Sequence, residues 1–350
     1  MLALKDVLNQ LTVEGELYEK LADQRVRCVA CGHRCLIPEG RDGVCRVRYN
    51  RGGTLYVPSG YVATSLQLDP VEKKPFFHVL PGSAALSFGM LGCDYHCGYC
   101  QNWITSQTLR DEDAVARPSR IAPETIVRAA LSHGAPIVTS TYNEPLITSE
   151  WAVSVFRLAK QHGLKTAFVS NGNGTPEVLD YLRPWLDLYK VDLKGFDDAK
   201  YRKLGGKLGN VLETIGNLVA RGFWVEVVSL IVPGWNDSPA ELSGMASFLA
   251  GVSRDIPWHV TAFHPDYKMA DRGWTPADTL RQAADLGQEA GLRYVYAGNI
   301  PGRTGNLEST YCPACQSLLI ERLGFQVRAN HLRPGGECPS CGTRIPGVWS

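Results

Sequence analysis

The sequence predicts an α/β fold built on a parallel β-sheet, with a cysteine-rich segment on each side of it. Between residues 84 and 300, short apolar stretches alternate with longer amphipathic ones. This alternation is typical of repeated strand–helix units, whose strands pair in parallel. Such a sheet either winds flat or curls into a full or partial barrel. In both cases the functional residues lie at the carboxyl ends of the strands.

The expected elements follow from the spacing of apolar residues. The strands are short and apolar, and they are expected at residues 84–91, 136–141, 164–170, 187–193, 223–232, 258–263 and 292–298. The helices are longer and amphipathic, and they are expected at 123–133, 147–162, 176–184, up to 221, 239–251 and 276–290. A further short helix is expected at the N-terminus, with one apolar face formed by Leu4, Val7, Leu8 and Leu11.

The pattern changes at both ends, so three domains are predicted. Residues 1–80 form an N-terminal helix and a cysteine-rich β module, residues 81–304 form the core, and residues 305–350 form a C-terminal cysteine-rich module. A chain of 350 residues is long enough for one barrel with such appendages.

The composition indicates a soluble cytoplasmic protein. The net charge of +1 gives no support for a nucleic acid or a membrane surface as the main partner. No stretch approaches the roughly 18 apolar residues that span a bilayer, and the N-terminal segment is too polar for a signal peptide. In a reducing compartment the 11 cysteines are expected to be metal ligands rather than disulfides.

The C-terminal module contains two Cys-x2-Cys knuckles, at Cys312, Cys315, Cys338 and Cys341. Two knuckles separated by a hairpin are typical of a zinc ribbon, in which a redox-silent ion holds together a segment too short for its own core. The favoured interpretation is structural zinc. An auxiliary iron–sulfur cluster is the alternative, because thiolates suit both metals. A nucleic-acid-binding ribbon is less favoured, because the tail has no dense basic run.

The N-terminal module contains a second set of four cysteines, at Cys28, Cys31, Cys35 and Cys45. Its spacing matches neither a standard zinc ribbon nor the cysteine run of bacterial ferredoxins. Structural zinc is again favoured and an auxiliary cluster is the alternative. His33 lies inside this loop, where it is either a substitute ligand or a polar loop residue.

The third set has only three cysteines, Cys93, Cys97 and Cys100, in the stretch GCDYHCGYCQN. A structural zinc needs four protein ligands, and a 4Fe–4S cluster is usually held by four cysteines. Completion of a zinc site by His96 is disfavoured, because a residue adjacent to Cys97 on a tight loop points elsewhere. The favoured interpretation is a 4Fe–4S cluster with one iron open to a substrate or cofactor.

These residues resemble a known family. The spacing C-x3-C-x2-C, with Tyr99 before the last cysteine and after the first strand, resembles the radical SAM superfamily, in particular its activating-enzyme-like branch. The stretches TYNEP, SNG, VDLKG and FHPDYKM, and the C-terminal knuckles, resemble the radical SAM enzyme of the AmmeMemoRadiSam system along essentially the full length. The resemblance implies a partial (β/α)6 TIM-like barrel and an oxidoreductase. The open iron would bind S-adenosylmethionine (SAM), and one-electron reduction would give a 5′-deoxyadenosyl radical that abstracts hydrogen from an unidentified substrate.

The resemblance also implies which residues contact SAM. Glu144 stands at the family's glutamate position, although Tyr142 and Asn143 replace the two glycines before it. Each of the following residues also has a purely structural alternative. Glu144 could be a surface helix cap, and Asp192 and Lys194 could form an ion pair at the end of a strand. His264 could be a histidine of the core. The implied SAM contacts are Tyr99, Asn143, Glu144, Ser170, Asn171, Asp192, Lys194 and His264, with Asp266, Tyr267 and Lys268 facing the substrate.

Implied partners are a low-potential electron donor of the flavodoxin or ferredoxin type, and Memo-like and AMMECR-like proteins. Two other functions remain open. One is an activase that installs a glycyl radical on another protein, against which the tail module argues. The other is a non-catalytic iron–sulfur or zinc-ribbon binding protein, which predicts no cofactor-side residues at the strand ends.

Overall fold

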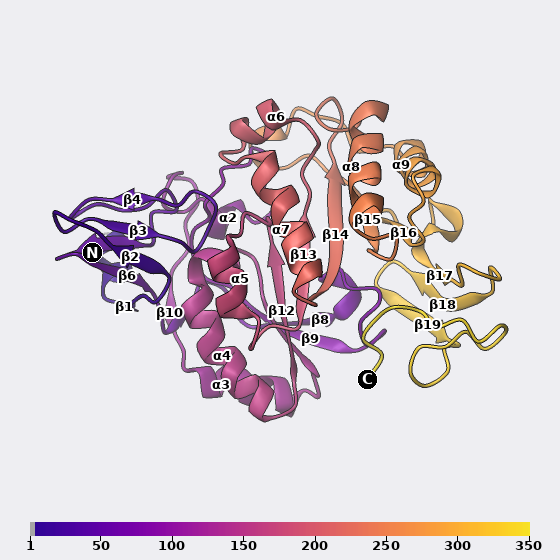
Figure 1. Ribbon diagram of the computed structural model, residues 1–350, viewed down its shortest axis with the longest axis horizontal. Coiled ribbons are helices and arrows are strands. Elements are labelled where there is room, and N and C mark those ends of the chain that lie inside the picture. Colours follow the sequence, from indigo (N-terminus) through magenta and orange to yellow (C-terminus); the bar gives the residue numbers. More distant parts are fainter. Residues whose placement is uncertain (1–3) are drawn as a thin grey trace.

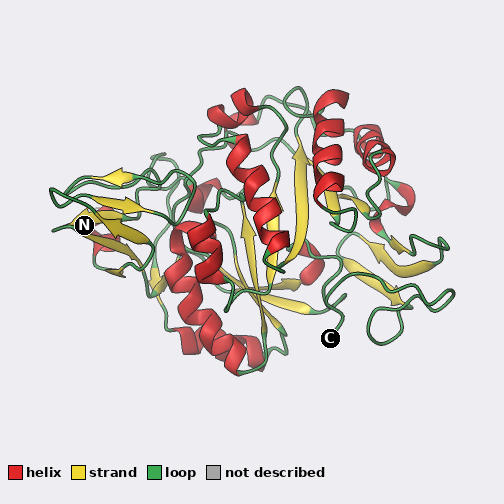
Figure 2. Cartoon of the chain, in the orientation of Figure 1, coloured by secondary structure: helices red, strands yellow, loops and turns green. Residues whose placement is uncertain are grey.

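The computed structural model describes residues 4–350, and its centre is one eight-stranded sheet (Figures 1 and 2). The strands lie in the order β16-β15-β14-β13-β12-β11-β9-β8. Their bounds are β8 Gln67–Pro70, β9 Ala84–Phe88, β11 Ile137–Ser140, β12 Lys165–Ser170, β13 Leu188–Asp192, β14 Trp224–Ile231, β15 Trp258–Ala262 and β16 Val295–Gly298. β9 and β11 to β16 pair in parallel, which confirms the α/β fold with a parallel sheet.

Helices connect the parallel strands and pack against one face of the sheet (Figure 1). They are α3 Pro123–Ser132, α4 Ser149–Gln161, α5 Pro176–Leu182, α6 Asp198–Lys203, α7 Leu208–Ala220, α8 Pro239–Val252 and α9 Ala277–Glu289. Their starts follow capping rules. The Thr175 hydroxyl accepts from the Val178 N–H, the Ser238 hydroxyl accepts from the Glu241 N–H, and both α5 and α8 begin with proline.

The two sheet edges differ from the expected pattern. β8 is an additional strand, antiparallel to β9, that the sequence did not predict because QLDP carries no apolar alternation. β16 occupies the other edge, so the stretch 292–298 does supply a seventh parallel strand. The six-stranded partial barrel remains a prediction.

The N-terminal segment is built from short antiparallel strands. The sheet β1-β6-β5 comprises Thr12–Glu14, Thr54–Pro58 and Tyr49–Arg51; the sheet β2-β3-β4 comprises Tyr18–Lys20, Val26–Cys28 and Leu36–Ile37; and β7 Tyr61–Val62 pairs with β10 Ser119–Arg120. The first helix, α1, spans Leu4–Asn9, so Leu11 lies beyond its end, where it is buried in the same core as Leu8.

The C-terminal segment forms the antiparallel sheet β17 Thr310–Tyr311, β18 Leu318–Leu323 and β19 Gln326–Asn330, and then returns to the core. The end of the chain pairs with the segment before β9, where Val348 and Val79 form a parallel bridge. In the same region the buried side chain of Arg322 donates to the carbonyl of Phe77 over 2.7 Å. The last residues therefore fix the segment 71–80 against the sheet. Among residues 4–350 we find no helix with the length and hydropathy to cross a membrane.

His78 links this segment to the tail and should make stability depend on pH. Its Nδ1 lies 2.7 Å from the Pro346 carbonyl and its Nε2 lies 2.6 Å from the Tyr296 hydroxyl, an arrangement that suits a neutral ring. Burial, partly opposed by Glu226, lowers the pKa of His78 to about 4. The contribution of His78 to the free energy of unfolding is therefore complete above the pKa of about 6.5 that it has in the unfolded chain. This contribution is lost as the pH falls from there to about 4, at about 1.4 kcal/mol per pH unit.

Urea unfolding between pH 7 and pH 4 checks this expectation. The free energy of unfolding of His78→Gln should fall less steeply with decreasing pH than that of the wild type. Any metal lost at low pH is lost from both proteins, so the difference in slope isolates His78. Equal slopes for the two proteins would refute this role.

Candidate active site

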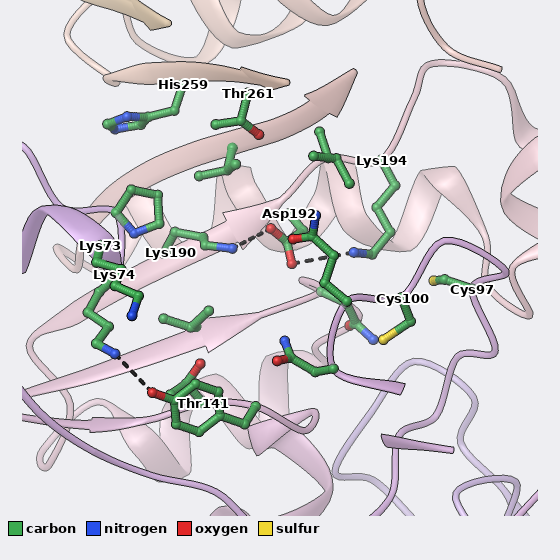
Figure 3. A pocket seen from close by; sticks show the side chains of 18 of the residues that line it. Lys73, Lys74, Cys97, Cys100, Thr141, Lys190, Asp192, Lys194, His259 and Thr261 are labelled. Carbon is green, nitrogen blue, oxygen red and sulfur yellow. Dashed lines mark hydrogen bonds and ion pairs between the residues drawn. The ribbon is translucent and has the colours of Figure 1, made fainter. Parts of the chain in front are cut away.

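A cavity of about 440 Å³ opens at the carboxyl ends of the strands and contains the three-cysteine loop (Figure 3). Its walls come from the loop after β9, from the segments after β11 and β12, and from β13 to β16. The predicted residues that line it are Cys93, Cys97, Tyr99, Cys100, Asn143, Glu144, Asn171, Asp192 and Lys194. Side chains that lie far apart in the sequence therefore meet at one site, as expected for a parallel sheet.

The three-cysteine loop is held by contacts from several elements. Arg110 donates to the Cys93 carbonyl over 2.7 Å, and Gln107 donates to the Tyr95 carbonyl over 3.1 Å. The Lys268 N–H donates to the Gly98 carbonyl over 2.9 Å. These bonds hold the backbone between the cysteines in a fixed shape.

The thiols of this loop are withdrawn from water but are not arranged as a closed group around one ion. Burial raises the pKa of Cys97 to about 12 and also raises the pKa of Cys93 and Cys100, so the thiolate forms need a cation beside them. Within residues 4–350, the tail cysteines form the metal-type group whose ligand atoms all lie within 4.8 Å of one another; the three loop thiols do not. Four sulfurs around one zinc ion lie about 3.8 Å apart, so the tail group has the spacing of a single-ion site and the loop thiols do not.

His96 lies away from the cavity, with its ring against Gly205, and it lines a separate surface pocket. The alternative of a zinc ion shared by the three cysteines and His96 is therefore disfavoured by the arrangement of the loop.

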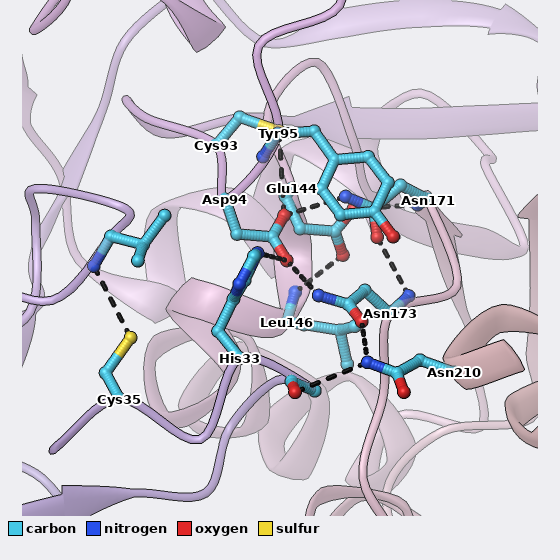
Figure 4. Close-up of polar contacts among 12 residues, drawn as sticks. His33, Cys35, Cys93, Asp94, Tyr95, Glu144, Leu146, Asn171, Asn173 and Asn210 are labelled. Atoms are coloured by element: carbon cyan, nitrogen blue, oxygen red, sulfur yellow. Dashed lines mark hydrogen bonds and ion pairs between the residues drawn. The ribbon is translucent and has the colours of Figure 1, made fainter. Parts of the chain in front are cut away.

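Glu144 is buried in a set of hydrogen bonds at the ends of β11 and β12 (Figure 4). Its carboxylate accepts from the Ser170 hydroxyl over 2.7 Å, from the Asn171 N–H over 2.7 Å and from the Leu146 N–H over 3.1 Å. The last bond caps a short 3-10 helix, but the side chain is only 2% exposed and is not a surface cap. Burial and the nearby charge of Asp94 raise the pKa of Glu144 to about 8.

Asp94 is a site residue that the sequence did not reveal. It is fully buried beside Cys93, and its carboxylate accepts from the Asn171 amide over 2.7 Å and from the Asn173 amide over 2.8 Å. His33 of the N-terminal cysteine segment lies 3.9 Å from the same carboxylate. Asp94 therefore joins the cysteine loop to β12 and to the N-terminal segment. Its place between Cys93 and Cys97 was the only indication in the sequence. That place alone does not distinguish Asp94 from the other residues between the cysteines.

Asp192 lies between two lysines. Lys194 Nζ is 3.3 Å from one carboxylate oxygen, and Lys190 forms a closer ion pair with the other. Burial alone would raise the pKa of Asp192, but the two lysines hold it below its usual value. Lys190 also lines the cavity and was missed, because it lies inside the strand β13, where an apolar residue was expected.

Other predicted residues lie elsewhere. Ser170 is buried behind Glu144 and supports it without lining the cavity. His264 does not line the cavity either, because the chain turns after β15 and the ring packs beside Phe263 and Trp274. In that turn Asp266 caps the 3-10 helix Tyr267–Met269, while Tyr267 and Lys268 both contact Asp111 rather than the cavity.

The four tail cysteines form a closed group. The Sγ atoms of Cys312 and Cys341 lie 3.6 Å apart, as do those of Cys315 and Cys338. Zn–S bonds of about 2.3 Å in a tetrahedron place sulfurs about 3.8 Å apart, so the spacing fits a single zinc-sized ion. Burial, then Asp94 and then the thiols of Cys28, Cys45 and Cys35 raise the pKa of Cys31, so the four N-terminal thiols lie near one another. They do not form such a tight group.

Loss of a tail cysteine should loosen the tail before the core. We expect Cys338→Ala to lose one metal ion per chain and to increase amide hydrogen exchange in β17, β18 and β19. Those strands bury few side chains, and the four cysteines lie in the segments that flank them. Exchange in β11 to β13 should change little. Elemental analysis and exchange mass spectrometry measure both effects. Unchanged exchange in the tail, with the metal lost, would contradict a structural ion.

This chain is similar to a known protein family and to individual proteins. Residues 89–245 match the radical SAM superfamily. Uncharacterized protein MJ0808 of Methanocaldococcus jannaschii is 39% identical over 334 residues, covering 95% of this chain and 98% of that protein. The pyruvate formate-lyase-activating enzyme of Clostridium pasteurianum is 25% identical over 211 residues, covering 55% of this chain and 84% of that enzyme.

Among solved structures, a radical SAM methyltransferase from Sphaerobacter thermophilus gives a TM-score of 0.47 at 16% identity, covering 68% of this chain and 71% of that one. The matched residues 89–245 include Cys93, Cys97 and Cys100 and the strands β11 to β14, which supply Glu144 and Asp192. The chain shares one family with MJ0808 and belongs to the radical SAM superfamily.

Proposed function

We propose that this protein is a radical SAM enzyme that reductively cleaves SAM and uses the resulting 5′-deoxyadenosyl radical to abstract hydrogen from a substrate. The observation that carries the proposal is the shared cavity. One buried and two half-buried thiols, a buried carboxyl and a lysine–aspartate pair line the same space. An electron carrier or a binding module has no need for this combination around its cysteines.

The donor set fits the 4Fe–4S cluster that the superfamily implies. Cys93, Cys97 and Cys100 would hold it, since their thiols carry no disulfide and line the same cavity. When bound, the cluster supplies a low-potential electron for the cleavage of the SAM sulfonium.

The chain's own residues would position SAM. Burial raises the pKa of Glu144 to about 8, so an ammonium group beside it would stabilise the carboxylate. Lys194, held by Asp192, would bind a carboxylate as a point charge. Tyr99 and Asn171, which also line the cavity, complete the proposed contacts. Asn143 accepts from the Met90 N–H over 2.9 Å and would keep the cysteine loop in register with β11.

Product analysis tests the proposal. The anaerobically reconstituted protein, with SAM and a strong reductant, should form 5′-deoxyadenosine. Methylthioadenosine in its place would mean that another carbon–sulfur bond breaks. No product from protein with an intact cluster would overturn the catalytic proposal.

A glycyl-radical activase is the second candidate, favoured by the 25% identity to the Clostridium pasteurianum enzyme. The two functions differ in the molecule from which hydrogen is abstracted, which is a partner protein in one case and a small molecule in the other. An activase would generate a stable protein-based radical on a partner chain, detectable by electron paramagnetic resonance, whereas an enzyme of small molecules would consume a soluble substrate.

We also propose partners and outer metal sites. A flavodoxin- or ferredoxin-type protein would supply the electron, and Memo-like and AMMECR-like proteins would act in the same system, as the sequence resemblance suggests. Cys312, Cys315, Cys338 and Cys341 would hold zinc. Cys28, Cys31, Cys35 and Cys45 would hold zinc or an auxiliary cluster. The proposed domains remain residues 1–80, 81–304 and 305–350.

A further inference from the structure

The cavity contains two pairs of lysines, and the two lysines of each pair share one aspartate. Lys190 and Lys194 both contact Asp192. Lys73 and Lys74 both contact Asp69, each over 2.8 Å. Each group of three side chains therefore carries one positive charge in excess.

The two groups lie at different ends of the cavity. In Figure 3, Lys73 and Lys74 are on the side opposite Cys97 and Cys100, with Lys190 between them. The Lys74 side chain is only 4% exposed, and its Nζ also lies 3.2 Å from the Tyr142 hydroxyl. A lysine buried to this degree needs an anion to compensate its charge, and Asp69 supplies that anion. The excess charge is that of Lys73, whose side chain is 51% exposed.

The other charged residues of the cavity are already engaged. Glu72 is fully buried and is paired with Arg322 of the tail at 3.6 Å. Glu144 accepts hydrogen bonds from Ser170 and Asn171. No further acid of the described cavity wall contacts Lys73 or Lys74, so this end of the cavity keeps one positive charge in excess.

Four apolar side chains line the cavity: Phe77, Val228, Leu230 and Ala297. Thr141, His259 and Thr261 add polar groups to the same lining. Phe325, from the turn between β18 and β19, lines the cavity as well, so the tail forms part of the enclosure. A wall built partly by the protein's own tail suits a small molecule better than the loop of another protein.

We propose that the substrate is a small organic anion whose carboxylate or phosphate binds Lys74 and Lys73 while its apolar body lies against Phe77, Val228 and Leu230. This inference rests on the proposed function. SAM would occupy the cysteine end, where its own carboxylate meets the excess charge of Lys190 and Lys194. The anion then fixes the far end of the substrate and leaves its apolar body facing the site of radical formation.

Calorimetric titration of the reconstituted protein with SAM tests this, with hexanoate, hexyl phosphate, hexan-1-ol and hexylammonium as probes in phosphate-free buffer. At least one anion should bind about tenfold or more tightly than hexan-1-ol. A preference for hexanoate assigns a carboxylate, and a preference for hexyl phosphate assigns a phosphate. Lys74→Gln should remove the advantage of the anion, and Lys74→Arg should retain it.

Lys160→Gln is the matched control, because Lys160 is also paired with an aspartate, Asp187, but lies outside the cavity. Its affinities should equal those of the wild type, and thermal melting verifies that the variants fold. Equal binding of hexanoate and hexan-1-ol, an unaltered preference in Lys74→Gln, or no binding of either anion at millimolar concentration would overturn the inference. Absence of 5′-deoxyadenosine would instead refute the proposed function, whatever the titration gives.

Discussion

Replacing Cys97 with alanine is expected to reduce reductive SAM cleavage by at least roughly 10³-fold, because residues that act as one unit fail together. Cys97 is buried at the centre of the three-cysteine loop, and two thiols remain in its absence. The variant should also lose the iron of this loop. Iron analysis together with chromatographic measurement of 5′-deoxyadenosine checks both expectations.

Cys315→Ala provides a comparison within the same chain. Cys315 belongs to the closed tail group and lies outside the cavity. This variant should keep the iron bound by Cys93, Cys97 and Cys100. If Cys97→Ala retained full iron and product formation, these cysteines would not hold the catalytic cluster.

Arg322→Met is expected to destabilise the protein by about 3–5 kcal/mol, because it leaves the buried carboxylate of Glu72 without its cation. Both side chains are 0% exposed, and Arg322 also donates to Thr310 and to the Phe77 carbonyl. Burial raises the pKa of Glu72, and the charge of Arg322 opposes this rise. Denaturant unfolding measures the loss.

The double variant Glu72→Gln/Arg322→Met removes the charge of both partners and should recover a substantial part of this stability. Arg293→Met is the surface control. Arg293 pairs with Asp255 where both side chains are at least 36% exposed, and such pairs contribute at most about 1 kcal/mol. A cost of Arg322→Met no greater than that of Arg293→Met would contradict the importance of the buried pair.

The repeating part of the fold could be predicted from the sequence because its strands are buried on both faces. Stretches such as 84–91 and 223–232 are largely apolar and are separated by amphipathic helices. β8 escaped prediction because its residues are mostly exposed and it is ordered by pairing with β9. The return of the tail onto the segment 71–80 depends on contacts between residues more than 200 positions apart, such as Arg322 with Phe77, which leave no local pattern.

The candidate site was predicted where a motif marked it. Cys93, Glu144 and Asp192 line the cavity, as expected for residues at the ends of parallel strands. Lys74 and Lys190 were missed. Lys74 lies in a polar loop and Lys190 lies inside a strand, and no local sequence pattern shows that their side chains line the cavity. His264 was predicted from its place after β15, but the turn at Pro265 directs the chain away from the cavity.

The central claim is that the three-cysteine loop holds a cluster with one iron open to SAM. The most direct test is the electron paramagnetic resonance spectrum of the reduced, reconstituted protein before and after addition of SAM. We predict the signal of a reduced 4Fe–4S cluster whose g-values shift when SAM binds, and loss of that shift in Cys97→Ala. A cluster signal that SAM leaves unchanged, or zinc in place of iron at these cysteines, would contradict the claim.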